Sequence, residues 1–220
     1  MRYDFQSINC YAESVCGDSF LCERTADGYL LVVSDGLGHG AKANVLSELT
    51  CEIAMSEWRG LSSLETLMSM LSLRLPVNAD NGRAYATFTL IDYNERRSQV
   101  NLVEYESPEA LFFRQRVRYD LHAVRCCQVD SSYALRVSHV VPRAGDRLVV
   151  VSDGVSQSGI GSPTMPFGWG DIGVSGCVRE VLSARVGISP AGLCDRLLNC
   201  ALSNEAYYAH DDMSVLCLEF

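Results

Sequence analysis

Hydrophobic residues along this chain follow two kinds of pattern, short apolar runs and helical repeats. The runs are rich in β-branched and aromatic residues and end at polar turns, which is typical of buried strands. They lie at 28–34, 85–94, 98–106, 110–115, 138–141, 147–152 and 213–220. The middle of the chain is therefore predicted to be rich in strands.

Apolar residues spaced three and four positions apart predict helices between these strands. The expected helices cover about 39–58, a segment from Ser62 onward, 172–186 and 190–206. Ser62 and Glu65 fit a capping box, and Ser189 followed by Pro190 is a strong helix start. Because the strands do not alternate regularly with the helices, the pattern predicts an α+β fold with mostly antiparallel sheets. The helices would cover the outer faces of a pair of sheets.

The segment VVSDG occurs twice, at 32–36 and at 150–154. In each copy a run of valines stops at Ser-Asp-Gly, so that Asp35 and Asp153 follow directly after a predicted buried strand. The residues that flank the two copies differ, which argues against a recent tandem repeat. Two distant segments are therefore predicted to deliver the same carboxylate group to a place where it is needed more than once.

Two further acidic positions share this setting. Asp18 lies in GDSF before an apolar segment, and Asp211 and Asp212 lie in HDDMSVL before the last strand. Taken singly, an Asp-Gly pair after a strand is usually only a turn. Several carboxylates brought together, however, repel one another unless a cation compensates them. Sites made of oxygen ligands suit Mg²⁺ and Mn²⁺, and no Cys or His residues have the spacing of a zinc site.

The chain is acidic, with 27 Asp and Glu residues against 18 Lys and Arg residues and a formal net charge of −9. This charge disfavours binding to nucleic acids and attachment to anionic membranes. The N-terminal sequence lacks the apolar core of a signal peptide, and no apolar run is long enough to span a bilayer. We therefore expect a cytoplasmic protein. The length of 220 residues suits one domain, and nothing in the pattern indicates an oligomeric state.

Ten cysteines are many for a chain of this length. No CxxC motif occurs, and Cys126 and Cys127 are adjacent. We expect reduced thiols that act as small apolar residues, some of them buried. A redox or metal-binding role for some of the thiols is the alternative.

The ordered set GDSF, SDGLGHG, ATFTLID, AGDRLVVVSDGV and DDMSVL resembles the metal-dependent protein serine/threonine phosphatases, the PPM or type 2C class. More narrowly it is similar to their bacterial branch typified by the stage II sporulation phosphatase SpoIIE. The resemblance extends from about residue 10 to residue 220. It implies one phosphatase domain over 1–220 with a four-layer αββα sandwich, in which two mostly antiparallel sheets are flanked by helical pairs. It also implies hydrolysis of phosphoserine or phosphothreonine on a regulatory protein, such as a STAS-type anti-anti-sigma factor.

The resemblance further implies a site for two Mn²⁺ or Mg²⁺ ions. The implied ligands are Asp18, Asp35, Gly36, Asp153 and Asp211. Asp35 would bridge the two ions, the carbonyl of Gly36 would bind one of them, and Asp18 would act mostly through water. The first acid of the last motif binds metal in the family, which selects Asp211 rather than Asp212. A metal-bridged hydroxide held by these acids would then attack the phosphorus atom in line with the leaving oxygen.

Three residues near the implied site have open or missing roles. His39 in DGLGHG could act as a general acid toward the leaving group, or it could be an exposed residue at a helix start. Eukaryotic relatives often have an arginine before the first metal acid, whereas YAESVCGDSF contains Glu13 and no basic residue. The SpoIIE-like branch commonly has an acid shortly after the second SDGV, whereas this chain has Gln157, to which no role is assigned.

Two other functions compete with a phosphatase. A catalytically silent domain could keep the PPM fold as a regulatory binding partner. A nucleotide-binding module is suggested by Gly36-x-Gly38-x-Gly40 between a strand and a helix. Its spacing is GxGxG rather than GxGxxG, and Asp35 before it would repel a phosphate. The rest of the chain also lacks the βαβ order of dinucleotide-binding folds.

Overall fold

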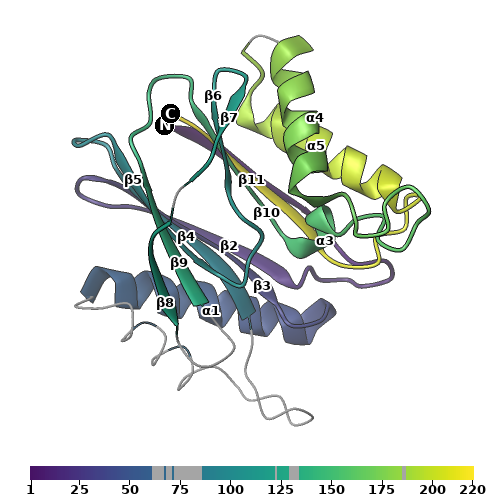
Figure 1. The fold of residues 1–220 in the computed structure, drawn as a ribbon. Helices are drawn as coiled ribbons and strands as arrows, with labels where there is room; N and C mark the ends of the chain where they lie inside the picture. The colour runs from purple at the N-terminus through teal and green to yellow at the C-terminus, as the bar shows by residue number, and fades with distance from the viewer. Residues whose placement is uncertain (61–66, 68–70, 72–85, 122, 129–133, 185–186) are drawn as a thin grey trace. The chain divides into compact units, whose positions relative to one another are not determined.

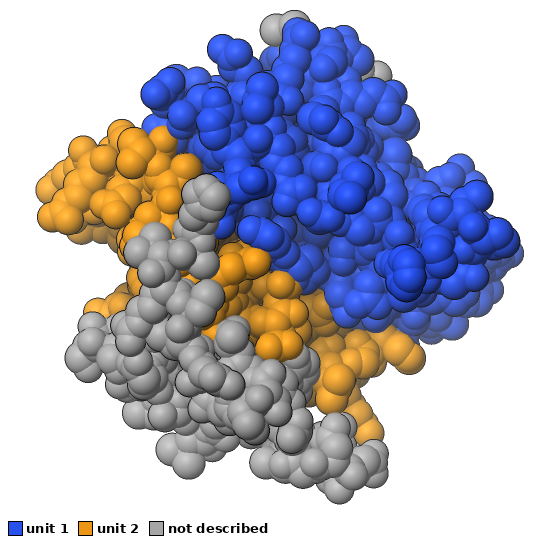
Figure 2. Space-filling model, viewed as in Figure 1, with its two compact units in different colours: residues 1–16, 108–121, 142–220 blue, residues 17–107, 122–141 orange. Residues whose placement is uncertain are grey.

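The residues of this chain fall into two units that are each assembled from distant segments. The structure, a computed structural model, describes residues 1–60, 67, 71, 86–121, 123–128, 134–184 and 187–220 (Figure 1). Unit 1 comprises residues 1–16, 108–121 and 142–220, and unit 2 comprises residues 17–107 and 122–141 (Figure 2). The expectation of one domain over 1–220 stays a prediction.

Unit 1 contains an antiparallel sheet in the order β1-β11-β10-β6-β7. Its strands are β1 (Arg2–Ile8), β11 (Met213–Glu219), β10 (Arg147–Val151), β6 (Leu111–Arg114) and β7 (Val117–Tyr119). The first and last strands of the chain pair along their whole length, which brings the two termini side by side (Figure 1). The central strands β10 and β11 are almost entirely buried, as their continuous apolar runs predict.

The helices of unit 1 are α3 (Asp153–Ser156), α4 (Gly170–Ala184) and α5 (Pro190–Asn204). The predicted start of α5 is confirmed, because the Ser189 hydroxyl accepts a hydrogen bond from the Gly192 amide at 3.1 Å and Pro190 lies in the first turn. Apolar residues of α4 and α5 form one buried cluster with β6, β10 and β11. This cluster is the hydrophobic core of unit 1.

Unit 2 contains a second antiparallel sheet in the order β2-β3-β4-β5-β9-β8. Its strands are β2 (Asp18–Arg24), β3 (Gly28–Gly36), β4 (Ala86–Asn94), β5 (Gln99–Tyr105), β9 (Ala134–Val140) and β8 (Ala123–Gln128). Helix α1 (Gly40–Gly60) packs on β2, β3 and β4. Leu67 and Leu71 are helical and buried in the same core as α1, while the predicted capping box at Ser62 and Glu65 lies outside the described residues.

The predicted α+β fold class is confirmed, because the chain forms two antiparallel sheets together with helices. Strands β1, β2, β7 and β8 were not predicted. Strand β1 is an edge strand whose residues are exposed or only half-buried, so it has no continuous apolar run. Across the described parts of the chain, no helix is both long enough and apolar enough to cross a membrane.

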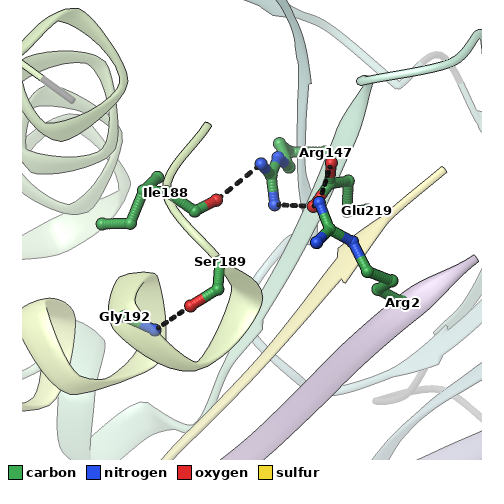
Figure 3. Close-up of polar contacts among 6 residues, drawn as sticks. All are labelled: Arg2, Arg147, Ile188, Ser189, Gly192 and Glu219. Atoms are coloured by element: carbon green, nitrogen blue, oxygen red, sulfur yellow. Dashed lines mark hydrogen bonds and ion pairs between the residues drawn. The ribbon is translucent and has the colours of Figure 1, made fainter. Parts of the chain in front are cut away.

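An ion-pair cluster connects the two ends of the chain to the loop between α4 and α5 (Figure 3). The strand register places Glu219 opposite both Arg2 and Arg147. Arg147 lies 2.9 Å from the Glu219 carboxylate and donates a 2.7 Å hydrogen bond to the carbonyl of Ile188. Burial lowers the pKa of Arg147, and the carboxylate of Glu219 opposes this shift. Arg2 contacts the same carboxylate from the solvent side, at 2.7 and 2.6 Å.

This cluster predicts unequal stability losses for its two arginines. Arg147→Ala should lower the free energy of unfolding by about 3 kcal/mol, because a nearly buried carboxylate loses its buried partner. Arg2→Ala should cost less than about 1 kcal/mol, since 65% of the Arg2 side chain is exposed against 6% for Arg147. Urea unfolding of both variants measures the difference. Equal losses would contradict the assignment of Arg147 as the main partner of Glu219.

Candidate functional site

The first Ser-Asp-Gly segment ends β3 and is locked by its neighbours. Ser34 is buried, and its hydroxyl donates a 2.8 Å hydrogen bond to the carbonyl of Thr87 in β4. A Cβ atom at Gly36 would lie 2.0 Å from the carbonyl oxygen of Ala43 in the first turn of α1. Only glycine fits this contact between the strand end and the helix. Asp35 between them is half-buried, so its carboxylate leaves the apolar layer at a fixed position.

Asp18 is the cross-strand partner of Asp35. It begins β2, and the register pairs it directly with Asp35 in β3. Residues directly opposite on antiparallel strands project from the same face of the sheet, and like charges in such a pair destabilise it. Asp18 is also buried, which strengthens the repulsion.

An acidic cavity lies next to Asp18. Its volume is about 580 Å³, and it is lined by β2 and α1. Glu48 and Glu52, one turn apart on α1, contribute carboxylates, and Asn44 contributes an amide. This lining would repel a phosphate group.

The second Ser-Asp-Gly segment repeats the construction of the first in unit 1. The buried Ser152 hydroxyl accepts a 2.8 Å hydrogen bond from the Ser214 amide and donates one to the Asp212 carbonyl at 3.3 Å. A Cβ atom at Gly154 would lie 2.1 Å from that same carbonyl oxygen. Asp153 between them is half-buried and begins α3. Serine and glycine therefore fix the position of the aspartate in both copies.

The two acids before β11 have different surroundings. Asp211 is half-buried. Its Cβ lies 3.3 Å from the place that a Cβ would occupy at Gly154, so Asp211 is next to the second Ser-Asp-Gly segment. Asp212 is buried, and its Oδ1 accepts a 2.9 Å hydrogen bond from the amide of Cys10. This bond connects Asp212 to the segment that follows β1, and the choice of Asp211 as the metal ligand stays a prediction. Asp212 Oδ2 is buried without a hydrogen bond from the described residues, so a water or a cation there would stabilise it.

The structure brings the predicted ligands together in two groups. Asp18, Asp35 and Gly36 belong to unit 2, whereas Asp153 and Asp211 belong to unit 1. Among the described residues of either unit, no three His, Cys, Asp or Glu side chains form a group that could hold a metal ion. The union of the two groups in one metal site is therefore still a prediction.

Two residues beside these turns can now be located. His39 is exposed and lies directly before α1, as the helix-start alternative predicts, and the general-acid alternative is not tested by this position. Gln157 Nε2 donates a hydrogen bond to Asp153 Oδ2 at 3.3 Å. The sequence predicts no role for Gln157, although its spacing of four residues from Asp153 is the spacing at which side chains meet on a helix.

The strand–loop–helix with Gly36, Gly38 and Gly40 does not have the surroundings of a nucleotide-binding loop. Both neighbours of β3 in its sheet, β2 and β4, run antiparallel to it. A dinucleotide-binding loop belongs to a parallel βαβ unit. The sheet around β3 therefore disfavours the nucleotide-binding alternative.

Comparison with known proteins finds one family and a group of solved structures. The family model for Stage II sporulation protein E (SpoIIE) matches residues 25–220. No curated protein matches the sequence. One similar structure contains the PP2C phosphatase domain and a fragment of the regulatory domain of the cell fate determinant SpoIIE from Bacillus subtilis. Its sequence identity is 17% and its TM-score 0.73, and the match covers 100% of this chain and 64% of that one.

Two further structures share this fold. The RsbU and RsbW domains of Rv1364c from Mycobacterium tuberculosis match with 17% identity and a TM-score of 0.75, over 99% of this chain and 59% of that chain. RsbX in complex with magnesium matches with 14% identity and a TM-score of 0.63, over 98% of this chain and 92% of that chain. The present chain thus spans less than two thirds of the SpoIIE and RsbU–RsbW chains. At these identities the likeness shows the fold.

The close contact between Gly154 and the Asp212 carbonyl oxygen predicts that one added methyl group at Gly154 lowers stability strongly. Gly154→Ala should lower the free energy of unfolding by about 2 kcal/mol or more, because the new Cβ would overlap the Asp212 carbonyl oxygen. Gly176→Ala in α4 is the matched control, since a Cβ there meets no atom within 4 Å. It should leave stability unchanged or raise it by up to about 1 kcal/mol. Urea unfolding measures both, and a neutral Gly154→Ala variant would disprove the proposed packing.

Proposed function

The chain belongs to the Stage II sporulation protein E (SpoIIE) family, and we propose that it is a metal-dependent protein serine/threonine phosphatase. The family match covers residues 25–220, and the solved structures with this fold include a PP2C phosphatase domain. The observation that carries the proposal is the twofold Ser-Asp-Gly construction. It presents Asp35 and Asp153 from strand ends in the same way, each with a second aspartate beside it.

We assign the metal site to two divalent cations, Mn²⁺ or Mg²⁺. The assigned ligands are the carboxylates of Asp18, Asp35, Asp153 and Asp211 and the carbonyl of Gly36. These groups offer only oxygen atoms, which hard divalent cations prefer. Asp18 and Asp35 face each other across a strand pair, and Asp211 lies beside the turn that follows Asp153, so each half of the assigned site offers two carboxylates. The magnesium complex of RsbX, which has the same fold, supports this assignment.

Different residues of this chain would have different roles in catalysis. When bound, the cations lower the pKa of a coordinated water toward neutrality and offset charge on the phosphoryl oxygens. Ser34 and Ser152 hold the strand ends that carry Asp35 and Asp153, so these carboxylates need no rearrangement during the reaction. Gln157 orients Asp153 from one turn away. His39, exposed before α1, is the candidate proton donor to the leaving oxygen.

The substrate proposed here is a phosphoserine or phosphothreonine on a regulatory protein. One chain with this fold combines RsbU and RsbW domains, which supports a protein rather than a small molecule as partner. A STAS-type anti-anti-sigma factor is the proposed example, from the resemblance of the motifs. No basic residue lies between Tyr11 and Asp18, so the cations would hold the substrate phosphate without an arginine from that segment.

The activity test compares variants of two assigned metal ligands with a variant of an aspartate outside the assigned site. Asp35→Asn and Asp153→Asn should each lower Mn²⁺-dependent hydrolysis of a chromogenic phosphate ester by on the order of a thousandfold. Asp27→Asn is the control, because Asp27 is an exposed turn residue paired with Arg96 at 2.9 Å, and it should retain full activity. Wild-type turnover in both site variants would refute the assignment. No turnover by the wild-type chain with Mn²⁺ would favour the catalytically silent alternative.

Metal binding can be tested without turnover. Adding Mn²⁺ to the chelator-treated protein should raise its thermal midpoint, because a ligand at 100 times its Kd stabilises the folded state by about 2.7 kcal/mol. Asp35→Asn and Asp153→Asn should each reduce the Mn²⁺-induced increase in thermal midpoint, while Asp27→Asn should leave it unchanged. The measurement is a thermal melt across a Mn²⁺ titration, supported by calorimetry. A full rise in both site variants would locate the metal elsewhere.

A further inference from the structure

Four cysteines of unit 1 form two thiol pairs around α5. The sulfur atoms of Cys177 in α4 and Cys200 in α5 lie 3.7 Å apart, and the Cys177 thiol donates to the Cys200 sulfur. The two helices pack against each other (Figure 1). The second pair, Cys194 in α5 and Cys217 in β11, lies in the core of unit 1, where the Cys194 thiol is 3.3 Å from the carbonyl oxygen of Asp4 and 3.6 Å from that of Val215. None of these four forms a disulfide in the structure, in agreement with the expectation of free thiols.

The two pairs differ in their access to small molecules. Cys177 and Cys200 both line a cavity of about 550 Å³ between α4 and α5. Cys177 is 8% exposed and Cys200 is half-buried, whereas Cys194 and Cys217 are both 0% exposed. A small oxidant can therefore reach the first pair from the cavity, while the second pair is sealed inside the core.

The surroundings also assign different roles to the two accessible thiols. Burial and the neighbouring Cys200 sulfur raise the pKa of Cys177 to about 12, so Cys177 keeps its proton. That proton is the one donated to the Cys200 sulfur. Arg196 lines the same cavity and precedes Cys200 by one helical turn, which places a positive charge near the pair. Cys200 is the more exposed of the two thiols and lies beside Arg196 in this cavity, so it is the thiol that an oxidant reaches and oxidises first.

We propose that Cys177 and Cys200 form a peroxide-sensitive dithiol that closes to a disulfide between α4 and α5. The Cys200 thiolate attacks one oxygen of hydrogen peroxide, the O–O bond breaks, and the departing hydroxide takes up a proton to leave as water. Cys200 is then a sulfenic acid. The Cys177 sulfur attacks it, the S–S bond forms, the S–O bond breaks, and a second water leaves with the Cys177 proton. The two sulfurs together lose two electrons, which the peroxide oxygens gain.

Closing the bond requires only a small movement. The sulfurs must approach by about 1.7 Å, from 3.7 Å to the usual S–S length of ~2.05 Å. The bond would link residues 23 positions apart and so enclose the whole connection between the two helices. Such a loop constrains the unfolded chain, so oxidation should raise the thermal midpoint of the protein by roughly 5–10 °C.

Peptide mapping of the oxidised full-length protein tests the proposal. The reduced protein is freed of reductant, treated with a small excess of hydrogen peroxide, alkylated and digested with trypsin and chymotrypsin. Trypsin cuts at Arg196, between Cys194 and Cys200, and chymotrypsin cuts at Tyr207 and Tyr208, between Cys200 and Cys217. The expected product is one cross-linked peptide pair that contains Cys177 and Cys200, about 2 Da lighter than the two reduced peptides together.

Two variants from the same helix serve as a matched pair. Cys200→Ser should abolish the cross-link and the rise in thermal midpoint, whereas Cys194→Ser should retain the cross-link. Separate oxidation of Cys177 and Cys200 without a bond between them would overturn the proposal. Faster cross-linking of Cys194 with Cys217 in the wild-type protein would overturn it as well. The readout is peptide mass, so its result is independent of metal binding and phosphatase activity.

Discussion

Contact between a glycine and the carbonyl of a neighbouring segment determines where the key acidic residues of this chain lie. At Gly36 the neighbour is the first turn of α1, and at Gly154 it is the residue before β11. In both places the backbone of the strand end has no room for a Cβ atom. The aspartate before each glycine is thereby held at the end of a buried strand, where its carboxylate can leave the apolar layer.

The buried serine completes this arrangement by a side-chain hydrogen bond to an adjacent strand. Ser34 binds β4 in one sheet, and Ser152 binds the start of β11 in the other. Each sheet then contributes a second acid, Asp18 by strand pairing and Asp211 by the approach to β11. The repeated sequence thus has one physical explanation, since three adjacent residues perform the same three tasks in both sheets. Carboxylates fixed in this way suit chemistry that relies on positioned cations more than on mobile side chains.

The pattern of apolar and polar residues along the chain was sufficient to predict most of the buried strands and helices. The apolar runs predicted β3, β4 and β10, and the Ser189–Pro190 start predicted α5, because these signals lie within a few adjacent residues. Contacts between distant residues were not predictable. The pairing of Asp18 with Asp35 depends on strand register, and the bond from the Cys10 amide to Asp212 joins residues 202 positions apart. The choice of Asp211 over Asp212 as a metal ligand rests on family resemblance and stays a prediction.

The pairing of β1 with β11 makes this chain suitable for circular permutation. Because Arg2 stands opposite Glu219, a short peptide could join Phe220 to Met1 without disturbing any strand. New ends could then be opened at the exposed hairpin turn of Gln115 and Arg116 between β6 and β7. A circular permutant of this kind would keep the order of strands in the sheet while converting its outermost terminal strand into an internal segment of the polypeptide.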